Sequence, residues 1–493
     1  MSAEPEATSL TRSTLLTMTM RWSDRLIGFV SLMVLARLLS PDDIGLVAMA
    51  MLVVALTDVL MDLGVNVALI RNPQASRSDF NTAWTLRLIQ NSLAAVVLVA
   101  TAPAAAAYFD APTITAIQPW LALSIVVAGF ENIGVIAFQK EMRFGAELRY
   151  LLTRRLFGFF LTIALAAALE SYWALVFGTL GGRAFGTALS YLVHPMRPRL
   201  ELSRFRPIIS VSRWMLLRSL GEYLNNQLHR LLVGRLAGTA TMGAYSIANE
   251  VSTIPSAELV APMNRALFPA MARLKDDAEA LRRLFLEATG MQALVALPAA
   301  VGLCLVASEA VPLLLGPRWE MAVPYVQWLT LAGAGQALCA SSHYLLLTIG
   351  RMSQAVLLIW LQVVVFALMA WLIDTDEAAE RMAMARFFAA SFAVFATAFA
   401  VRRALVTVTL TSITTAVVRP FAGILGMAVT ITCVPAPFLG VAQLLLWKIL
   451  LGTGSYVAIV LALWWIVGRP TGPETWFLTR IPSLRKFCAP KDN

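Results

Sequence analysis

The sequence predicts an all-α, polytopic membrane protein. We expect about fourteen transmembrane helices, arranged as two six-helix lobes around a central cavity, with two further C-terminal helices. Composition is the first reason, because 59% of the 493 residues are hydrophobic and only 14% are charged, whereas soluble domains carry roughly 25% charged residues. A soluble core stops growing at about 250–300 residues, so lipid must solvate this apolar surface. A soluble enzyme, a nucleic-acid-binding protein and a receptor with a folded ectodomain are thereby excluded.

The second reason is a series of apolar segments, each near the roughly 20 residues that a transmembrane helix needs. Pro, Gly and charged residues separate them, for example at Ser40-Pro41, His194-Pro195 and Gly316-Pro317. The acidic, polar N-terminus has no signal-peptide pattern, so we expect the first helix to be retained. The predicted helices lie at residues 15–38, 43–70, 80–108, 113–139, 148–169, 172–193, 208–236, 243–267, 285–307, 322–349, 353–373, 383–401, 411–434 and 441–467.

Lys and Arg residues are distributed very unequally between the two sides of these helices. With the N-terminus inside, 25 of them fall on the inner side, including Arg154 and Arg155 after the fourth helix. Four fall outside, namely Arg37, Arg235, Arg318 and Arg381. Cytoplasmic loops carry such an excess, so we expect both termini in the cytoplasm. The net charge of +10 then reflects contact with an anionic leaflet and predicts no nucleic-acid partner.

An internal repeat is the third reason. Residues 36–50 (ARLLSPDDIGLVAMA) and 234–248 (GRLAGTATMGAYSIA) align at an offset of 198, which superposes Gly45 on Gly243. Six helices separate the copies, so both copies have the same orientation and are related by an axis along the membrane normal. We expect an N-terminal lobe with its cytoplasmic linker at 1–206, a C-terminal lobe at 207–405, two further transmembrane helices at 406–467 and a basic cytoplasmic tail at 468–493.

Charged side chains inside the predicted helices are the main candidates for function, because a charge at the bilayer centre costs about 2.5–3.5 kcal/mol on insertion scales. They gather on the opening helices of each repeat, as polar stripes that would line one water-filled cavity between the lobes. Arginine suits an anionic ligand, because its guanidinium fork pairs with phosphate. We therefore assign ligand binding to Arg21, Arg25, Arg87, Arg218 and Asn225. The carboxylates that tune the cavity or relay protons are Asp24, Asp58, Asp62, Glu131, Glu222 and Glu250.

These side chains also have a purely structural interpretation. Arg21 and Arg25 lie near the cytoplasmic end of the first helix, where they can snorkel to headgroups or pair with Asp24. The two aspartates of the second helix can bond to neighbouring helices. Arg218 and Glu222 are four residues apart on one helix and can satisfy each other.

The sequence contains no signature of an enzyme. None of the five lysines follows a glycine, which excludes a Walker A motif. The three histidines form neither HExxH nor a zinc triad, and the four cysteines contain no CxxC pair. A GxSxG nucleophile motif is also missing. We therefore expect no catalytic residue, no metal and no cofactor. If transport is coupled to an ion, we expect the ion to be H⁺ or Na⁺.

Two segments resemble a known family. Residues 35–71 (LARLLSPDDIGLVAMAMLVVALTDVLMDLGVNVALIR) resemble the start of bacterial polysaccharide transporters, the lipid-linked oligosaccharide flippase branch of the multidrug/oligosaccharidyl-lipid/polysaccharide exporter superfamily. Residues 232–277, with the ending FPAMARL, look like the second-lobe opening of the same family. The resemblance covers nearly the whole chain. The family has no short catalytic motif, so the site residues above rest on this chain alone.

This resemblance implies alternating-access flipping of polyprenyl-diphosphate-linked oligosaccharide repeat units across the bacterial inner membrane, for exopolysaccharide, capsule or O-antigen synthesis. It implies an undecaprenyl-diphosphate type of substrate. From the residues of this chain alone, we expect Arg25, Arg87 and Arg218 to face the diphosphate or acidic sugars. Membrane lipids, a polysaccharide polymerase and glycosyltransferases are the expected partners. The alternatives are a cation-coupled multidrug antiporter or a peptidoglycan-precursor flippase of the same superfamily and, from another class, a membrane-embedded polysaccharide polymerase.

Overall fold

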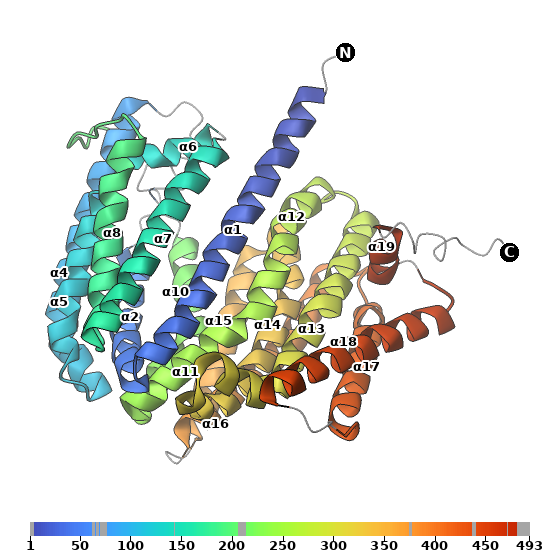
Figure 1. The fold of residues 1–493 in the computed structure, drawn as a ribbon. Coiled ribbons are helices and arrows are strands. Elements are labelled where there is room, and N and C mark those ends of the chain that lie inside the picture. The colour runs from blue at the N-terminus through green and yellow to red at the C-terminus, as the bar shows by residue number, and fades with distance from the viewer. Residues whose placement is uncertain are drawn as a thin grey trace. The chain divides into compact units, whose positions relative to one another are not determined.

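The computed structural model describes residues 4–61, 65, 69, 76–141, 143–205, 213–373, 377–435, 440–470 and 472–480. Every regular element in these residues is a helix (Figure 1), which confirms the predicted all-α class. By its internal contacts the chain divides into two units, Met1–Ala244 and Tyr245–Asn493. The lobe boundaries expected at 206 and 405 stay a prediction.

The helices of the first unit are α1 (Glu4–Leu38), α2 (Pro41–Met61), α4 (Arg77–Phe109), α5 (Ile114–Gly129), η1 (Ile133–Val135), α6 (Ile136–Lys140), α7 (Phe144–Leu169), α8 (Trp173–Val193), α10 (Arg213–Leu236) and the start of α11 (Gly238–Thr253). The second unit continues from α11 into η2 (Ile254–Glu258), α12 (Leu259–Arg273), α13 (Ala278–Leu315), η3 (Pro317–Ala322), α14 (Val323–Thr348), α15 (Met352–Trp371), α16 (Ala378–Ala404), α17 (Leu410–Cys433), α18 (Val441–Ile466) and α19 (Pro473–Arg480).

Each predicted membrane helix overlaps a helix of the structure, but two of them are interrupted. The helix predicted at 113–139 is divided into α5 and the η1–α6 segment, which are bent by 64° relative to each other. The helix predicted at 243–267 contains η2, a π-helical turn that includes Pro255. Hydropathy does not detect such breaks, because the residues on both sides remain apolar.

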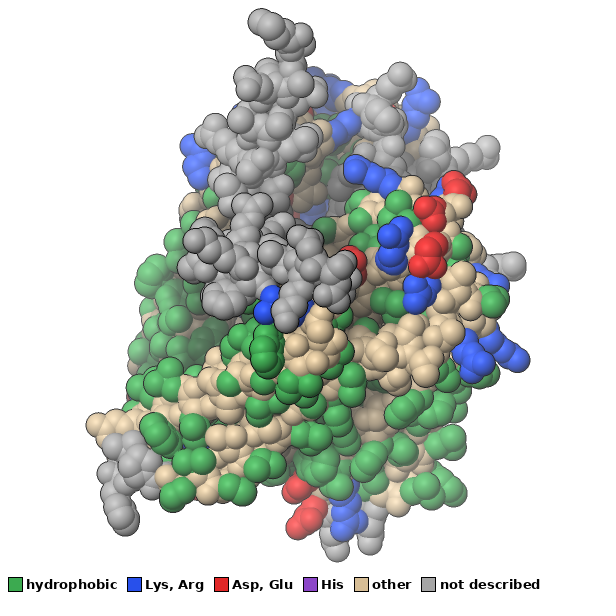
Figure 2. All heavy atoms as spheres, turned by 90° about the vertical axis from the view of Figure 1, so that its right-hand side faces the viewer, with side chains coloured by type: hydrophobic (Ala, Val, Ile, Leu, Met, Phe, Trp, Pro, Cys, Tyr) green, Lys and Arg blue, Asp and Glu red, His purple; other side chains and the backbone are tan. Residues whose placement is uncertain are grey.

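The surface of the helices is suited to lipid. In the described part of the chain, eight helices are long and apolar enough to cross a membrane, or nine if the bent α5–α6 pair is one span. Large hydrophobic side chains such as Leu357, Leu368 and Trp371 are exposed. On the face in Figure 2, hydrophobic side chains are spread over the lower part, and most Lys and Arg side chains lie above them, apart from a small charged group at the lower edge. Apolar surface of this extent requires lipid around it, so the protein is embedded in a membrane.

Glycine residues bring α7 and α8 into close contact in the first unit. Gly178, Gly182 and Gly186 recur at every fourth position of α8 and therefore lie on one face. A Cβ atom at Gly178 would lie 2.3 Å from Oγ1 of Thr162 on α7, and one at Gly182 would lie 3.4 Å from Cα of Gly158. Small residues allow membrane helices to approach in this way.

The two copies of the internal repeat meet at their matching glycines, within the first unit. A Cβ atom at Gly45 in α2 would lie 1.8 Å from the carbonyl oxygen of Thr239, and one at Gly243 in α11 would lie 1.9 Å from that of Pro41. The offset of 198 relates Gly45 to Gly243 and Pro41 to Thr239, so each copy makes the same contact with the other. A two-fold axis produces such reciprocal contacts, which supports the predicted repeat.

In the second unit, α13 packs against α14, α17 and α18. Two ion pairs also link helices of this unit. Lys448 Nζ of α18 lies 2.6 Å from Glu309 Oε1 of α13, and Arg419 Nε of α17 lies 3.0 Å from Glu474 Oε1 of α19. Both side chains of the second pair are nearly buried. The C-terminal helices are therefore attached to the second unit by charge as well as by apolar contact.

Candidate functional site

The bend between α5 and α6 places Glu131 outside regular helix. α5 ends at Gly129 and η1 begins at Ile133, so Glu131 and Asn132 form a link between two helical pieces. Discontinuous membrane helices of this kind commonly form ligand and ion sites, because the interrupted backbone exposes polar groups. The bend is therefore the first place to look for a site.

Asn132 holds this bend in place. Its backbone N–H donates to Ser190 Oγ of α8 at 2.9 Å, and its side-chain Nδ2 donates to the carbonyl oxygen of Met196 at 2.7 Å. Its Oδ1 accepts from the Gly134 N–H at 2.9 Å. The residue is buried, and leaving buried polar partners unsatisfied is costly. The bend is therefore stabilised by contacts with α8 and the segment after it.

A cavity of about 480 Å³ lies beside the bend, within the first unit. This volume is in the range of small-molecule sites. The lining residues are Asp58, Val59, Val65, Arg87, Gln90, Asn91, Ile125, Ala128, Glu131, Arg154, Arg183 and Ser219. They come mainly from α2, α4, α5, α7, α8 and α10, so six helices of one unit contribute to a single site.

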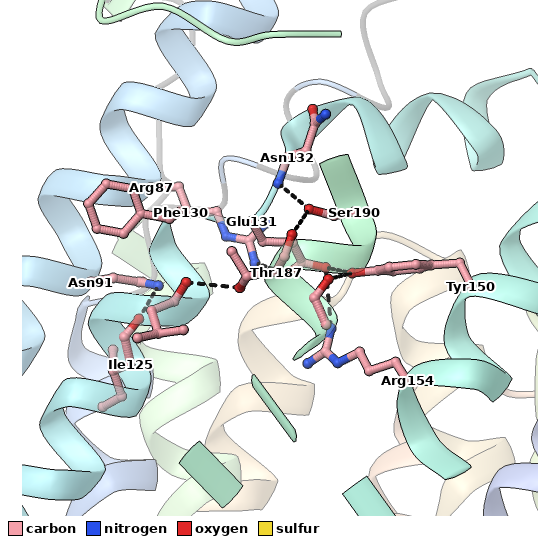
Figure 3. Close-up of polar contacts among 12 residues, drawn as sticks. Arg87, Asn91, Ile125, Phe130, Glu131, Asn132, Tyr150, Arg154, Thr187 and Ser190 are labelled. Carbon is pink, nitrogen blue, oxygen red and sulfur yellow. Dashed lines mark hydrogen bonds and ion pairs between the residues drawn. The ribbon is translucent and has the colours of Figure 1, made fainter. Parts of the chain in front are cut away.

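Two arginines share the Glu131 carboxylate in this cavity (Figure 3). Arg87 Nη2 of α4 lies 2.7 Å from Oε2, and Arg154 Nη1 of α7 lies 3.2 Å from Oε1. The Tyr150 hydroxyl donates a third hydrogen bond to the same carboxylate. Glu131 and Tyr150 are buried, whereas 23% of the Arg87 side chain and 35% of the Arg154 side chain stay exposed. The carboxylate is fully engaged, while both guanidinium groups still reach the cavity.

The small residues of α8 let Arg154 reach this position. A Cβ atom at Gly186 would lie 2.7 Å from Arg154 Cδ, so glycine leaves room for the arginine side chain. Thr187 Oγ1 donates to a carbonyl oxygen of α5 at 3.0 Å, and Asn91 Nδ2 of α4 donates to the carbonyl oxygen of Ile125 at 3.1 Å. These contacts hold α4 and α8 against α5 and so fix the walls from which the arginines project.

The charges that line the cavity do not cancel. Arg87, Arg154 and Arg183 face the two carboxylates of Glu131 and Asp58, which leaves a net charge of +1. Arg183 is attracted by Asp58 and repelled by Arg154. Each guanidinium has five N–H donors in a planar fork, which matches phosphate oxygens. The cavity is therefore suited to an anion, and to phosphate in particular.

The structure brings three predicted site residues together here: Asp58, Arg87 and Glu131. Arg218 instead forms a 2.8 Å ion pair with Glu222 along α10. That pair is the structural alternative considered from the sequence, and Ser219 is the α10 residue in the cavity lining.

The remaining predicted residues lie elsewhere. Asp24 on α1 forms an ion pair with Arg155 of α7, with 3.1 Å between Oδ1 and Nε. Arg25 on α1 and Asn225 on α10 are not among the described residues that line this cavity. Glu250 is exposed on the part of α11 in the second unit. Two predicted residues lie outside the described residues, Asp62 entirely and Arg21 by its side chain. The functional roles of all these residues stay predictions.

Three residues of the site were not predicted. Arg154 was counted only among the inner-side charges, although it lies within the helix predicted at 148–169; in the structure α7 begins at Phe144 and carries Arg154 well inside the helix. Arg183 lies in the middle of a predicted helix. A charge inside a predicted membrane helix is the signal that identified Arg87, so the same signal could have identified Arg183. Tyr150 carries no charge at neutral pH, and its sequence context gave no signal.

The segment after α8 runs along the start of α4. The Glu201 carboxylate accepts hydrogen bonds from Ser203 at 2.6 Å, from Ser78, and from Asn81 Nδ2 at 2.9 Å. These bonds lower the pKa of Glu201 to about 2, because they stabilise the ionised form. Since Asn132 binds the same segment, α4, the bend and this segment form one connected structure.

Fold and cavity together define the class, a polytopic helical membrane protein with a cavity suited to an anion. The structure is similar to the lipid II flippase MurJ in an inward closed conformation, with a TM-score of 0.71 and 10% identity over 92% of this chain and 99% of MurJ. It is also similar to an inward-facing multidrug resistance MATE family transporter of the MOP superfamily, with a TM-score of 0.58 and 13% identity over 78% of this chain and 96% of that one. At these identities the likeness concerns the fold, and it confirms the predicted fold class.

Sequence similarity identifies the family. Residues 34–324 match the family described as polysaccharide biosynthesis protein, and the chain belongs to this family. It is 27% identical over 315 residues to the lipopolysaccharide biosynthesis protein WzxC of Escherichia coli K12, covering 62% of this chain and 63% of WzxC. It is 23% identical over 307 residues to the succinoglycan biosynthesis transport protein ExoT of Rhizobium meliloti, covering 62% of each. The matched part is thus less than two thirds of these two relatives. The family resemblance seen in the sequence is confirmed.

Proposed function

We propose that this protein moves lipid-linked oligosaccharide units across the membrane during polysaccharide synthesis. The observation that carries the proposal is the arginine-lined cavity at a broken helix, in a chain of the polysaccharide biosynthesis protein family. The substrate is an oligosaccharide on a polyprenyl diphosphate of the undecaprenyl type. Its diphosphate is the anion that Arg87 and Arg154 bind, and its prenyl chain stays in lipid.

The transport cycle is alternating access in the bacterial inner membrane, with both termini in the cytoplasm. The cavity accepts the headgroup from one side and releases it on the other. An H⁺ or Na⁺ gradient drives the cycle through carboxylates such as Asp58 and Glu131. A polysaccharide polymerase then consumes the translocated unit, and glycosyltransferases supply it.

The net positive charge of the cavity argues against the multidrug antiporter, because an organic cation would be repelled by an excess of guanidinium groups. A peptidoglycan-precursor flippase and a membrane-embedded polymerase are distinguished by experiment. Deletion of a peptidoglycan-precursor flippase would stop growth. Deletion of a polymerase would leave complete units on the outer leaflet without polymer.

The test is deletion of the gene, followed by complementation with variants. Surface polysaccharide and lipid-linked repeat units in inner-membrane vesicles are both measured. We expect deletion to abolish polymer and to leave intact units on the cytoplasmic leaflet. The double variant Arg87→Ala/Arg154→Ala should fail to restore export.

The matched control is Arg155→Ala. Arg155 is next to Arg154 in α7 but pairs with Asp24 of α1, so its loss should leave export intact. Normal polymer in the deletion strain, together with new sensitivity to cationic drugs, would show that the protein is an antiporter.

A further inference from the structure

Glu131 occupies the position that an anionic ligand would take in this cavity. Arg87 donates to one oxygen of its carboxylate at 2.7 Å and Arg154 donates to the other at 3.2 Å. Carboxylate and phosphate are the two groups that the guanidinium fork binds best. A phosphate in the cavity and the Glu131 carboxylate therefore compete for the same two guanidinium groups.

We propose that Glu131 is a displaceable counter-ion that makes the cavity selective for a diphosphate; this inference rests on the proposed function. Without ligand, Glu131 balances one of the two positive charges that contact it and orients both arginines. A monoanion that replaces Glu131 again balances only one of the two positive charges. A diphosphate has two linked anionic groups, which can bind both guanidinium groups and the positive charge of Arg183.

Tyr150 provides a partner for the displaced carboxylate. Its hydroxyl donates to Glu131 and lies 3.2 Å from the carbonyl oxygen of Gly186, and the residue is buried. A buried carboxylate without hydrogen bonds would be strongly unfavourable. The hydroxyl donates to Oε1, the oxygen that Arg154 also contacts, and it carries no charge. Glu131 can therefore turn away from the guanidinium groups and keep this bond. Asp58 on α2 is the other carboxylate that faces the same cavity.

The same competition favours release of the ligand. When the diphosphate leaves, Glu131 pairs again with Arg87 and Arg154, so the two charges are not left uncompensated in a half-buried site. Transport requires binding that is strong enough for entry and weak enough for exit. Glu131 therefore serves selectivity and release together.

The experiment is isothermal titration calorimetry of the full-length protein in lipid nanodiscs at low ionic strength, with inorganic pyrophosphate and inorganic phosphate as probes. Glu131→Gln removes the competing charge and nearly preserves the shape. We expect this variant to bind pyrophosphate at least about tenfold more tightly than wild type, because close charge pairs couple by this amount or more. The gain for phosphate should be smaller.

A second variant is expected to act in the opposite direction. Tyr150→Phe removes the hydroxyl that competes with the arginines for Glu131, so pyrophosphate should bind several-fold more weakly. The matched control is Glu147→Gln. Glu147 is also a buried carboxylate of the first unit, but it accepts a 2.6 Å hydrogen bond from Gln139. Pyrophosphate affinity should not change in this control.

The proposal would be overturned if Glu131→Gln and Tyr150→Phe changed the affinity for pyrophosphate in the same direction. It would also be overturned if the Glu131→Gln variant folded but bound pyrophosphate no more tightly than wild type. In both cases Glu131 is only a positioning residue for the arginines. An equal gain for phosphate would overturn the selectivity. If Glu131→Gln fails to fold, the sign of the Tyr150→Phe effect decides. Absence of pyrophosphate binding in every variant would instead overturn the cavity assignment, and with it the proposed substrate contact.

Discussion

Replacement of Gly45 by alanine is expected to separate the two copies of the repeat where their matching glycines meet. The added Cβ would lie 1.8 Å from the carbonyl oxygen of Thr239, whereas real Cβ contacts essentially never fall below 3.0 Å. The two helices must therefore move apart by about 1.2 Å along that line, the difference between these distances. The carbonyl oxygen belongs to the backbone, so no side-chain rotation can relieve the clash.

The size of the effect follows from packing. Overpacking costs about 1–3 kcal/mol, and a clash between backbones belongs at the upper end. The higher helix propensity of alanine offsets about 0.5–1 kcal/mol of this loss in the free energy of unfolding, because glycine is a poor helix former. The net destabilisation is then about 2 kcal/mol. At about 2–4 °C per kcal/mol for a domain of 150–250 residues, the melting temperature should fall by roughly 4–8 °C.

The assay is thermal unfolding of the full-length protein in lipid nanodiscs, followed by tryptophan fluorescence. Gly145→Ala and Gly302→Ala are the controls, because among the described residues no heavy atom beyond the local helix backbone lies within 4 Å of either Cβ position. Gly243→Ala should cost about as much as Gly45→Ala. The double variant should cost less than the sum of the two, because one separation relieves both clashes. Equal melting temperatures for Gly45→Ala and Gly145→Ala, or strictly additive losses, would refute the reasoning.

Three further changes test other parts of the fold. Asn132→Ala removes the side-chain hydrogen bonds that hold the bend, each worth about 1 kcal/mol, so amide exchange at the bend should rise; unchanged exchange would contradict this role. Glu474→Ala leaves Arg419 nearly buried without its carboxylate, which costs about 3–5 kcal/mol in comparable pairs. Proteases should then cleave near α19, and Arg419→Met/Glu474→Leu should restore resistance. The pKa of Glu201 is about 2 in the folded protein against an ordinary value of 4.5, so its contribution to stability is complete above about pH 4.5 and is lost as the pH falls toward 2. Amide exchange in the segment after α8 is compared between wild type and Glu201→Gln. The difference should become smaller as the pH falls from about 4.5 toward 2. A difference that already becomes smaller between pH 7 and 5 would contradict the lowered pKa of Glu201.

Helix positions were predictable because they depend on local composition. Apolar segments and helix breakers are both visible in the sequence, and every predicted segment overlaps a helix. The bend at Glu131 was not predictable in this way, because residues 129–136 contain no proline, and glycines like the two in this stretch, Gly129 and Gly134, also occur inside unbroken helices such as α8. The bend comes from the hydrogen bonds of Asn132 to α8 and to the segment after it, which form only when distant parts of the chain meet.

The same distinction applies to the site. Arg87 and Glu131 were predicted as candidates, because charge inside a membrane helix is rare and therefore informative. Their pairing was not predicted, because they are 44 residues apart and meet only when α4 packs on α5. The Arg218–Glu222 pair was foreseen because four residues of helix bring its members together.

The segment that follows α8 is mechanically coupled to the cavity. It is bonded to α4 through Glu201 and to the bend through Asn132, and Asn132 is next to Glu131 in the chain. Displacement of this segment therefore moves the carboxylate that orients Arg87. Its Arg197 side chain is exposed, so a contact made on this segment, away from the cavity, would shift Glu131 relative to the arginines.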